Sequence, residues 1–155
     1  MRKTYFPEIT APIPFEGKDS KNPLAFKYYD KNARVGRKTM AEHLRFAVAY
    51  WHTMMADGTD MFGGSSYDRP WDVAGDPIDR AKYTMDAAFE FFQKLGVEYY
   101  CFHDRDIAPA GETFAQSCKN LQIMVDHARV LQKQTGVKLL WGTANLFGHR
   151  IYTSG

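Results

Sequence analysis

The sequence contains only two cysteines among 155 residues, Cys101 and Cys118. Two cysteines cannot supply the ligand spacing of a structural zinc site. The pair fits reduced thiols, and Cys101 lies inside an apolar run. We therefore interpret Cys101 as a core residue rather than a reactive nucleophile.

Long apolar runs and a charge excess are also missing. No run approaches the ~20 residues of a membrane-spanning helix. The 20 basic and 18 acidic residues give a net charge of +2, too balanced for a nucleic-acid or membrane-surface partner. The first residues contain no apolar stretch typical of a signal peptide and soon reach Pro7. We expect a cytoplasmic protein without nucleic-acid or membrane partners.

Several common catalytic motifs are absent from the sequence. No Gly-x-Gly-x-x-Gly follows the first expected strand, which weakens the case for a dinucleotide-binding fold. There is also no P-loop, no serine nucleophile elbow and no kinase signature. Asp60, Asp104 and Asp106 are too few to predict a hard-cation site, which needs several carboxylates on different elements.

The hydrophobic periodicity predicts three strands separated by two helices. The strands are expected at 45–53, 97–102 and 137–141, and the helices at 77–95 and about 113–135. Asp76 and Gly96 are typical of the two ends of the first helix, and Gly136 of the end of the second. A helix remains the rival interpretation for 45–53. The alternation predicts an α/β protein with parallel strands, either a doubly wound sheet or the start of a (β/α)8 barrel.

Two irregular segments flank the first expected strand. Residues 1–44 contain scattered proline, glycine and asparagine, and they predict an N-terminal arm that packs on a larger body. Residues 55–76 form a long loop rich in glycine and proline. Loops of this length in a compact domain usually serve function.

The segment 99–106 combines an apolar strand with a histidine and two carboxylates. His103 and Asp106 lie just beyond the apolar run, and α/β enzymes place their chemistry at such strand ends. A carboxylate can fix the tautomer of an imidazole and raise its basicity, which suits proton transfer. The alternative is a structural capping pair. For Asp104 and Arg105 a solvated or interface ion pair is the favoured interpretation.

Tryptophans stand near the ends of the other two expected strands. Trp51 and Trp141 could form an apolar wall of a pocket, since aromatic faces suit sugar rings. Core packing is the alternative, and composition alone favours it.

Taken together, these segments resemble the xylose isomerases of the class with a long N-terminal extension. The resemblance covers almost the whole chain in order. The segments that carry it are 22–29, 42–53, 58–63, 69–71, 102–106 (Phe-His-Asp-Arg-Asp) and 140–147 (Leu-Trp-Gly-Thr-Ala-Asn-Leu-Phe).

The resemblance implies a (β/α)8 TIM barrel in a homotetramer that interconverts D-xylose and D-xylulose. Two divalent cations, Mg²⁺, Mn²⁺ or Co²⁺, would assist the hydride shift after ring opening. His103 matches the histidine that helps to open the sugar ring, and Asp106 the carboxylate that orients it. Phe62 matches an aromatic residue that reaches into the neighbouring subunit's pocket. The other matched substrate-binding positions are Trp51, Trp141, Thr143 and Phe147.

The same resemblance implies that much of such an enzyme lies outside this sequence. The family's metal ligands belong on later strands, so we assign none here. Residues 45–155 would form the first part of a barrel, about three strands and two helices, incomplete without residues beyond 155. We therefore expect an N-terminal fragment that is inactive alone. The alternatives are another TIM-barrel sugar isomerase or epimerase, and an inactive truncated relic or assembly module.

Overall fold

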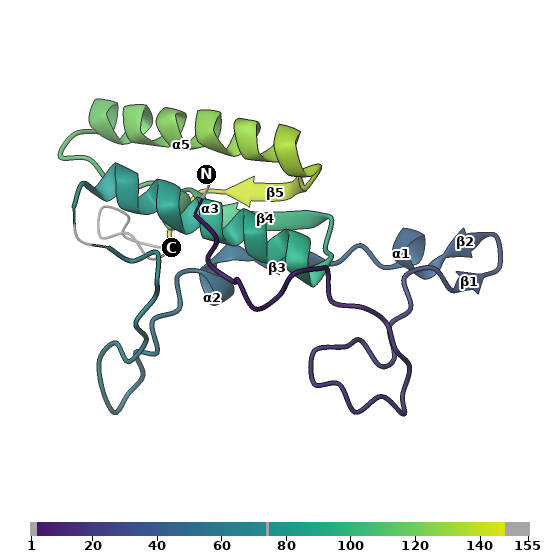
Figure 1. Ribbon diagram of the computed structural model, residues 1–155. Helices are drawn as coiled ribbons and strands as arrows, with labels where there is room; N and C mark the ends of the chain where they lie inside the picture. Colours follow the sequence, from purple (N-terminus) through teal and green to yellow (C-terminus); the bar gives the residue numbers. More distant parts are fainter. Residues whose placement is uncertain (1–2, 74, 148–155) are drawn as a thin grey trace.

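A computed structural model describes residues 3–73 and 75–147 of the chain (Figure 1). The elements follow one another as β1 (Arg34–Val35), β2 (Lys38–Thr39), α1 (Met40–His43), β3 (Ala47–Ala49), α2 (Tyr50–Thr53), α3 (Pro77–Leu95), β4 (Tyr99–His103), α4 (Asp104–Ile107), α5 (Phe114–Thr135) and β5 (Lys138–Thr143). The end of the expected barrel segment 45–155 lies outside the described residues. None of the helices among those residues is long and apolar enough to cross a membrane.

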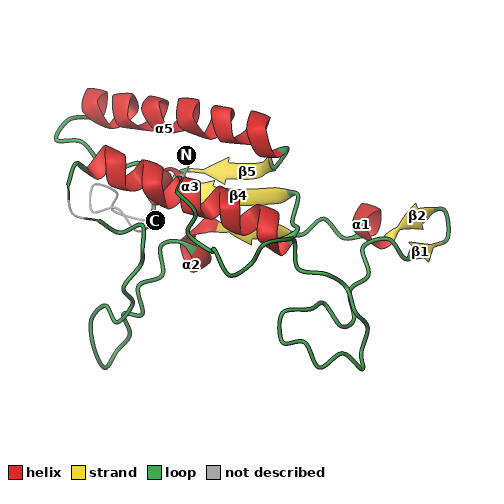
Figure 2. Cartoon of the chain, in the orientation of Figure 1, coloured by secondary structure: helices red, strands yellow, loops and turns green. Residues whose placement is uncertain are grey.

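The sheet at the centre of the fold has three parallel strands in the order β3-β4-β5. Helix α3 connects β3 to β4, and α5 connects β4 to β5 (Figure 2). This arrangement confirms the predicted alternation of parallel strands and helices. The protein is thus a mixed α/β fold with a small parallel sheet.

The two long helices begin and end where the sequence predicts. The Asp76 carboxylate accepts hydrogen bonds from the first backbone N–H groups of α3, and Thr113 caps α5 in the same way. Gly96 and Gly136 follow the helices with φ angles of 77° and 76°, a left-handed conformation that glycine adopts without steric cost.

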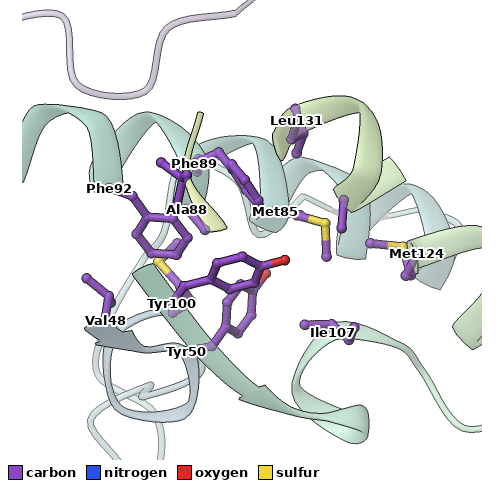
Figure 3. Packing of buried hydrophobic residues seen from close by; sticks show 14 of the residues in the cluster. Val48, Tyr50, Met85, Ala88, Phe89, Phe92, Tyr100, Ile107, Met124 and Leu131 are labelled. Carbon is purple, nitrogen blue, oxygen red and sulfur yellow. The ribbon is translucent and has the colours of Figure 1, made fainter. Parts of the chain in front are cut away.

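The hydrophobic core lies between these helices and one face of the sheet (Figure 3). Tyr100 of β4 packs on Phe89 and Phe92 of α3, with ring centroids 5.1 and 5.5 Å apart. Met124 and Leu131 of α5 close the same cluster. Because side chains alternate along a strand, Tyr100 faces the helices while Cys101 and His103 point to the other face.

The segment 45–53 is neither the single strand nor the single helix that the sequence allows. Only Ala47–Ala49 form β3, and Tyr50–Thr53 continue as the helical turn α2. Alanine and tyrosine tolerate both conformations, so the parallel pairing with β4 decides where the strand stops.

The N-terminal arm packs on the body through aromatic and polar contacts. Phe6 lies 5.8 Å from the rings of both Trp71 and Phe91. The Glu90 carboxylate accepts the backbone N–H groups of Tyr5 and Phe6, and Lys94 donates to the Phe6 carbonyl. Within this arm, which the sequence predicts to be irregular, the structure also contains β1, β2 and the short helix α1.

Candidate functional site

The parallel register brings the carboxyl ends of the three strands to one edge of the sheet. His103, the last residue of β4, is paired with Thr143, the last residue of β5. Trp51 stands in α2, directly after β3. Residues that are far apart in the sequence therefore meet around one imidazole.

Asp106 holds His103 from the first turn after the strand. Its Oδ2 accepts the backbone N–H of His103 at 2.7 Å and lies 3.1 Å from the imidazole Nδ1. Both side chains are nearly buried, with 11 and 10 % of their surface exposed. Because an ionised carboxylate only accepts hydrogen bonds, this contact requires the proton on Nδ1 and leaves Nε2 for another partner.

Aromatic rings surround this imidazole on several sides. The centroids of Trp51, Phe147 and Trp141 lie 4.6, 5.2 and 6.1 Å from that of His103. The two tryptophans also contact each other, at 5.3 Å. The structure therefore gathers the predicted site residues of all three strand ends around His103, and only Phe62 among the predicted positions is missing from this group.

Phe62 lies apart from the strand-end cluster, at the tip of the long loop. Its side chain is 89 % exposed. The backbone N–H groups of Ser66 and Tyr67 donate to the Asp57 carbonyl at the base of the loop, and Phe62 N–H donates to Asp60. At the base, Gly58 has a φ of 83°, and a Cβ there would collide with the Ser66 side chain. The loop thus presents Phe62 outward on a hydrogen-bonded stem.

Asp104 has a role that the sequence interpretation missed. The sequence favours a solvated or interface ion pair with Arg105, and the Arg105 Nε does lie 3.8 Å from the Asp104 Oδ2. The same carboxylate also accepts the backbone N–H of Asn145 at 2.8 Å, across to the segment that follows β5. A contact between residues 41 positions apart leaves no local sequence signal.

A tyrosine and a cysteine are buried beneath the site. Burial, and then the nearby Asp106 carboxylate, raise the pKa of Tyr50 far above its usual range and also raise the pKa of Cys101. The Tyr50 hydroxyl is fully buried and has no hydrogen-bond partner among the described residues. Both groups therefore stay protonated at neutral pH, and neither is poised as a nucleophile.

The described residues do not fit a divalent-metal site. Within 3–73 and 75–147 no three histidine, cysteine, aspartate or glutamate side chains gather closely enough to hold an ion. Asp104 and Asp106 are the carboxylates nearest to His103 in sequence, and both already accept backbone hydrogen bonds. We therefore assign no step to a metal held by these residues.

A cavity in the described structure lies away from this site. Its volume is about 590 Å³, and it lies at the opposite, amino-terminal end of the strands. Arm residues such as Phe15 and Phe26 line it together with Leu95 and Val97. None of the residues that line this cavity belongs to the aromatic cluster around His103.

The fold and the site define an α/β protein of parallel strand–helix units with a histidine–carboxylate pair at a strand end. Comparison with known proteins adds a similarity in sequence. The chain is 57 % identical over 153 residues to xylose isomerase 1 of Xanthomonas axonopodis pv. citri, 58 % to xylose isomerase 2 of Xanthomonas campestris pv. campestris and 56 % to a xylose isomerase of Xanthomonas oryzae pv. oryzae. In sequence, this chain is a homologue of the xylose isomerases.

These matches cover 99 % of the chain but 34 % of each relative. The chain therefore spans about a third of the length of the curated relatives it matches. No family model matches the chain.

Proposed function

We propose that this chain supplies the sugar-ring-opening part of an aldose–ketose isomerase that interconverts D-xylose and D-xylulose. One observation carries the proposal: the His103–Asp106 pair stands at a strand end, with its imidazole surrounded by three aromatic rings. The names of the relatives, at 56–58 % identity, support the same reaction.

Opening a cyclic aldose requires a proton at the ring oxygen and removal of one from the anomeric hydroxyl. His103 suits this exchange, since Asp106 holds Nδ1 and leaves Nε2 for the sugar. Asp106 acts as the orienting carboxylate, because its second contact fixes it to the His103 backbone. The pair can therefore deliver or accept a proton without losing its orientation.

The aromatic rings give this site one apolar wall. Trp51 and Trp141 lie in contact beside the imidazole, and Phe147 meets it edge-on. Such faces pack on the C–H groups of a sugar and displace water from its reacting carbons. We assign Trp51, Trp141, Thr143 and Phe147 to substrate binding on this ground.

The transfer of hydrogen between adjacent carbons would follow ring opening. The resemblance to xylose isomerases implies that Lewis-acid chemistry from two divalent cations would assist that step. Side chains other than those described here would have to hold the cations, because the described residues form no such cluster. Our proposal for this chain's own residues is limited to binding and ring opening.

We further propose the architecture in which this site works. The three parallel strands would belong to a (β/α)8 barrel, and residues 1–44 would form its N-terminal arm. Phe62, exposed on its hydrogen-bonded stem, would enter the pocket of a neighbouring subunit in a homotetramer. The expected cytoplasmic location belongs to the same proposal.

A hybrid protein tests the proposed reaction. The third of the Xanthomonas axonopodis relative that matches this chain is replaced by the chain itself, and conversion of D-xylose to D-xylulose is measured with Mg²⁺ or Mn²⁺. We expect the hybrid to be active and the 155-residue chain alone to be inactive. Turnover by the chain alone, above a metal-free control, would contradict the expected inactivity of the fragment.

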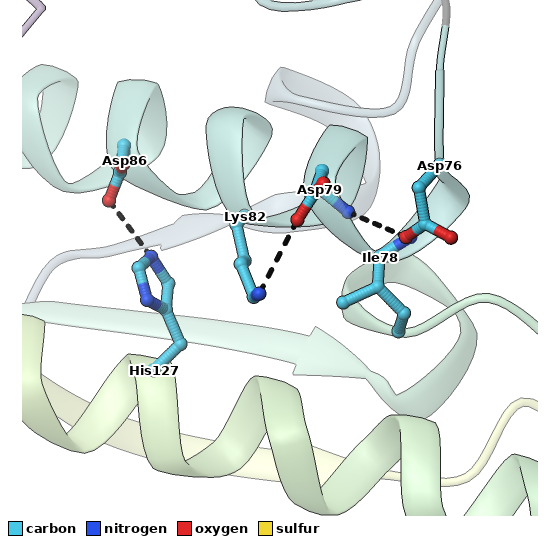
Figure 4. A network of polar contacts seen from close by, with 6 residues as sticks. All are labelled: Asp76, Ile78, Asp79, Lys82, Asp86 and His127. Carbon is cyan, nitrogen blue, oxygen red and sulfur yellow. Dashed lines mark hydrogen bonds and ion pairs between the residues drawn. The ribbon is translucent and has the colours of Figure 1, made fainter.

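A matched pair of histidine variants of that hybrid tests whether His103 acts as the general acid–base. His103→Asn should lower kcat by about 10²–10⁴-fold, the usual contribution of a general acid–base. His127→Asn is the control, because His127 also pairs with a carboxylate, Asp86, at 2.9 Å, but between α5 and α3 (Figure 4). A hybrid that assembles normally and converts another aldose but not xylose would favour the alternative barrel isomerase or epimerase. An assembled hybrid without any activity would overturn the proposal.

A further inference from the structure

The Asp104 carboxylate links the end of β4, where His103 stands, to the segment that follows β5. Its Oδ1 accepts the N–H of Arg105, its own neighbour, at 2.9 Å and the N–H of Asn145 at 2.8 Å. Asp104 opens the turn after β4, whereas Asn145 lies just beyond the end of β5. One oxygen therefore joins both segments through their backbones.

The segment beyond β5 needs such a link because packing holds it only weakly. Phe147 is 66 % exposed, and Leu146 before it is also exposed. Even so, the Phe147 ring meets the His103 imidazole edge-on, at 5.2 Å and 85°. A ring with so little buried surface gains little free energy from packing at this position. A hydrogen bond nearby in the chain is therefore needed to fix the position of the ring.

We propose that Asp104 is a positioning residue, which fixes residues 144–147 by its bond to Asn145 and so holds the Phe147 ring against His103. The part of this inference that concerns sugar binding rests on the proposed function. The geometric part does not, because it concerns only a backbone hydrogen bond and a ring contact.

NMR spectroscopy of the 155-residue chain tests the geometric part without any turnover. In the unmodified chain we expect the His103 ring protons to carry a ring-current shift from Phe147, identified by its disappearance in Phe147→Ala. Asp104→Ala should abolish the same shift and speed exchange of the Asn145 amide about tenfold, the effect of losing one charge-assisted bond. Absence of a Phe147 ring-current shift in the unmodified chain would overturn the inference whatever the variants do.

Two variants separate a tether from a general structural role. Asp104→Asn keeps an acceptor oxygen and should retain both signals, while Arg105→Ala removes the ion-pair partner and should also retain them. Loss of both signals in Arg105→Ala would mean that the ion pair, and not the Asn145 bond, positions the ring. Unchanged signals in a folded Asp104→Ala would equally overturn the inference.

The hybrid enzyme carries the functional part of the test. Asp104→Ala should raise KM for xylose about tenfold with kcat within about twofold, and Asp104→Asn should restore KM. If no hybrid turns over xylose while the NMR signals behave as expected, the proposed function fails and the positioning role stands. If KM is unchanged in an active hybrid, Asp104 does not position the sugar site.

Discussion

A single oxygen of Asp106 accepts both the backbone N–H and the ring Nδ1 of His103, at 2.7 and 3.1 Å. The imidazole is thus oriented relative to its own main chain, through one short helical turn. Orientation of this kind survives movement of the surrounding loops, because both partners belong to one short segment, β4 and α4.

Asp106→Asn should therefore weaken the chemistry more than the fold. The amide can still accept from the His103 backbone, but it no longer carries the charge that stabilises an imidazolium. We expect kcat of the hybrid enzyme to fall about 10²-fold or more, with an unchanged melting temperature. Nitrogen chemical shifts of His103 should show a changed tautomer balance. A normal kcat would contradict the orienting role.

Glu90→Gln should loosen the N-terminal arm. Burial alone would raise the pKa of Glu90, but hydrogen bonds from Tyr5, Lys94 and Phe6 outweigh it and lower the pKa. The variant should reduce the free energy of unfolding by about 1–3 kcal/mol at pH 7, measured by denaturant titration. Asp126→Asn, at an exposed pair with Arg129, is the control and should change it by less than about 0.5 kcal/mol.

The stabilisation that Glu90 provides should depend on pH. A carboxylate with a lowered folded-state pKa stabilises the fold above its unfolded pKa, near 4.5, and this contribution is lost as pH falls through the folded value. The advantage of the unmodified chain over Glu90→Gln should therefore shrink below about pH 4.5. Denaturant titrations at a series of pH values measure this difference. An advantage that stays constant down to about pH 3 would show that the charge of Glu90 is irrelevant.

Tyr50→Phe should increase the stability of the folded protein, and the increase should be largest at alkaline pH. Its hydroxyl is fully buried without a partner in the described structure, so removing it should be neutral or favourable by about 1 kcal/mol at pH 7. The raised pKa keeps Tyr50 protonated in the folded state while the unfolded chain loses its proton near pH 10, so stability falls as pH rises above that value. Melting curves between about pH 8 and 11 should show a shallower decline for Tyr50→Phe. Parallel curves would contradict burial of this hydroxyl.

The two cysteines should differ in reactivity. Both are free, Cys118 is exposed, and burial raises the pKa of Cys101. Iodoacetamide at about pH 8 should modify Cys118 first and reach Cys101 only in denaturant, as followed by mass spectrometry with Cys118→Ser as reference. Rapid labelling of Cys101 in the folded Cys118→Ser variant would show that β4 is open to solvent.

The long elements could be predicted from the sequence because their signals are local. Asp76, Gly96 and Gly136 mark helix ends by their own backbone preferences, and each is confirmed. The short elements α2 and α4 were not predicted, since four residues contain no complete period and their conformation depends on the strand before them.

The candidate site was predictable in its members but not in its contacts. A histidine three residues before an aspartate suggests their pairing, which the structure contains. Trp51 contacts His103, and Asn145 donates to Asp104, between segments that follow different strands. These contacts form because the register of the sheet brings the ends of the strands together. No local sequence pattern separates Asp104 from an ordinary surface aspartate.

The hydrogen bonds between α3 and the N-terminal arm limit which substitutions the arm can accept during evolution. Glu90 and Lys94 hold the backbone groups of residues 5 and 6, not their side chains. Most substitutions at positions 5 and 6 keep these backbone hydrogen bonds, whereas proline would remove an N–H donor and with it one bond to Glu90. Related chains should therefore avoid proline at these two arm positions, as long as position 90 keeps an acidic side chain.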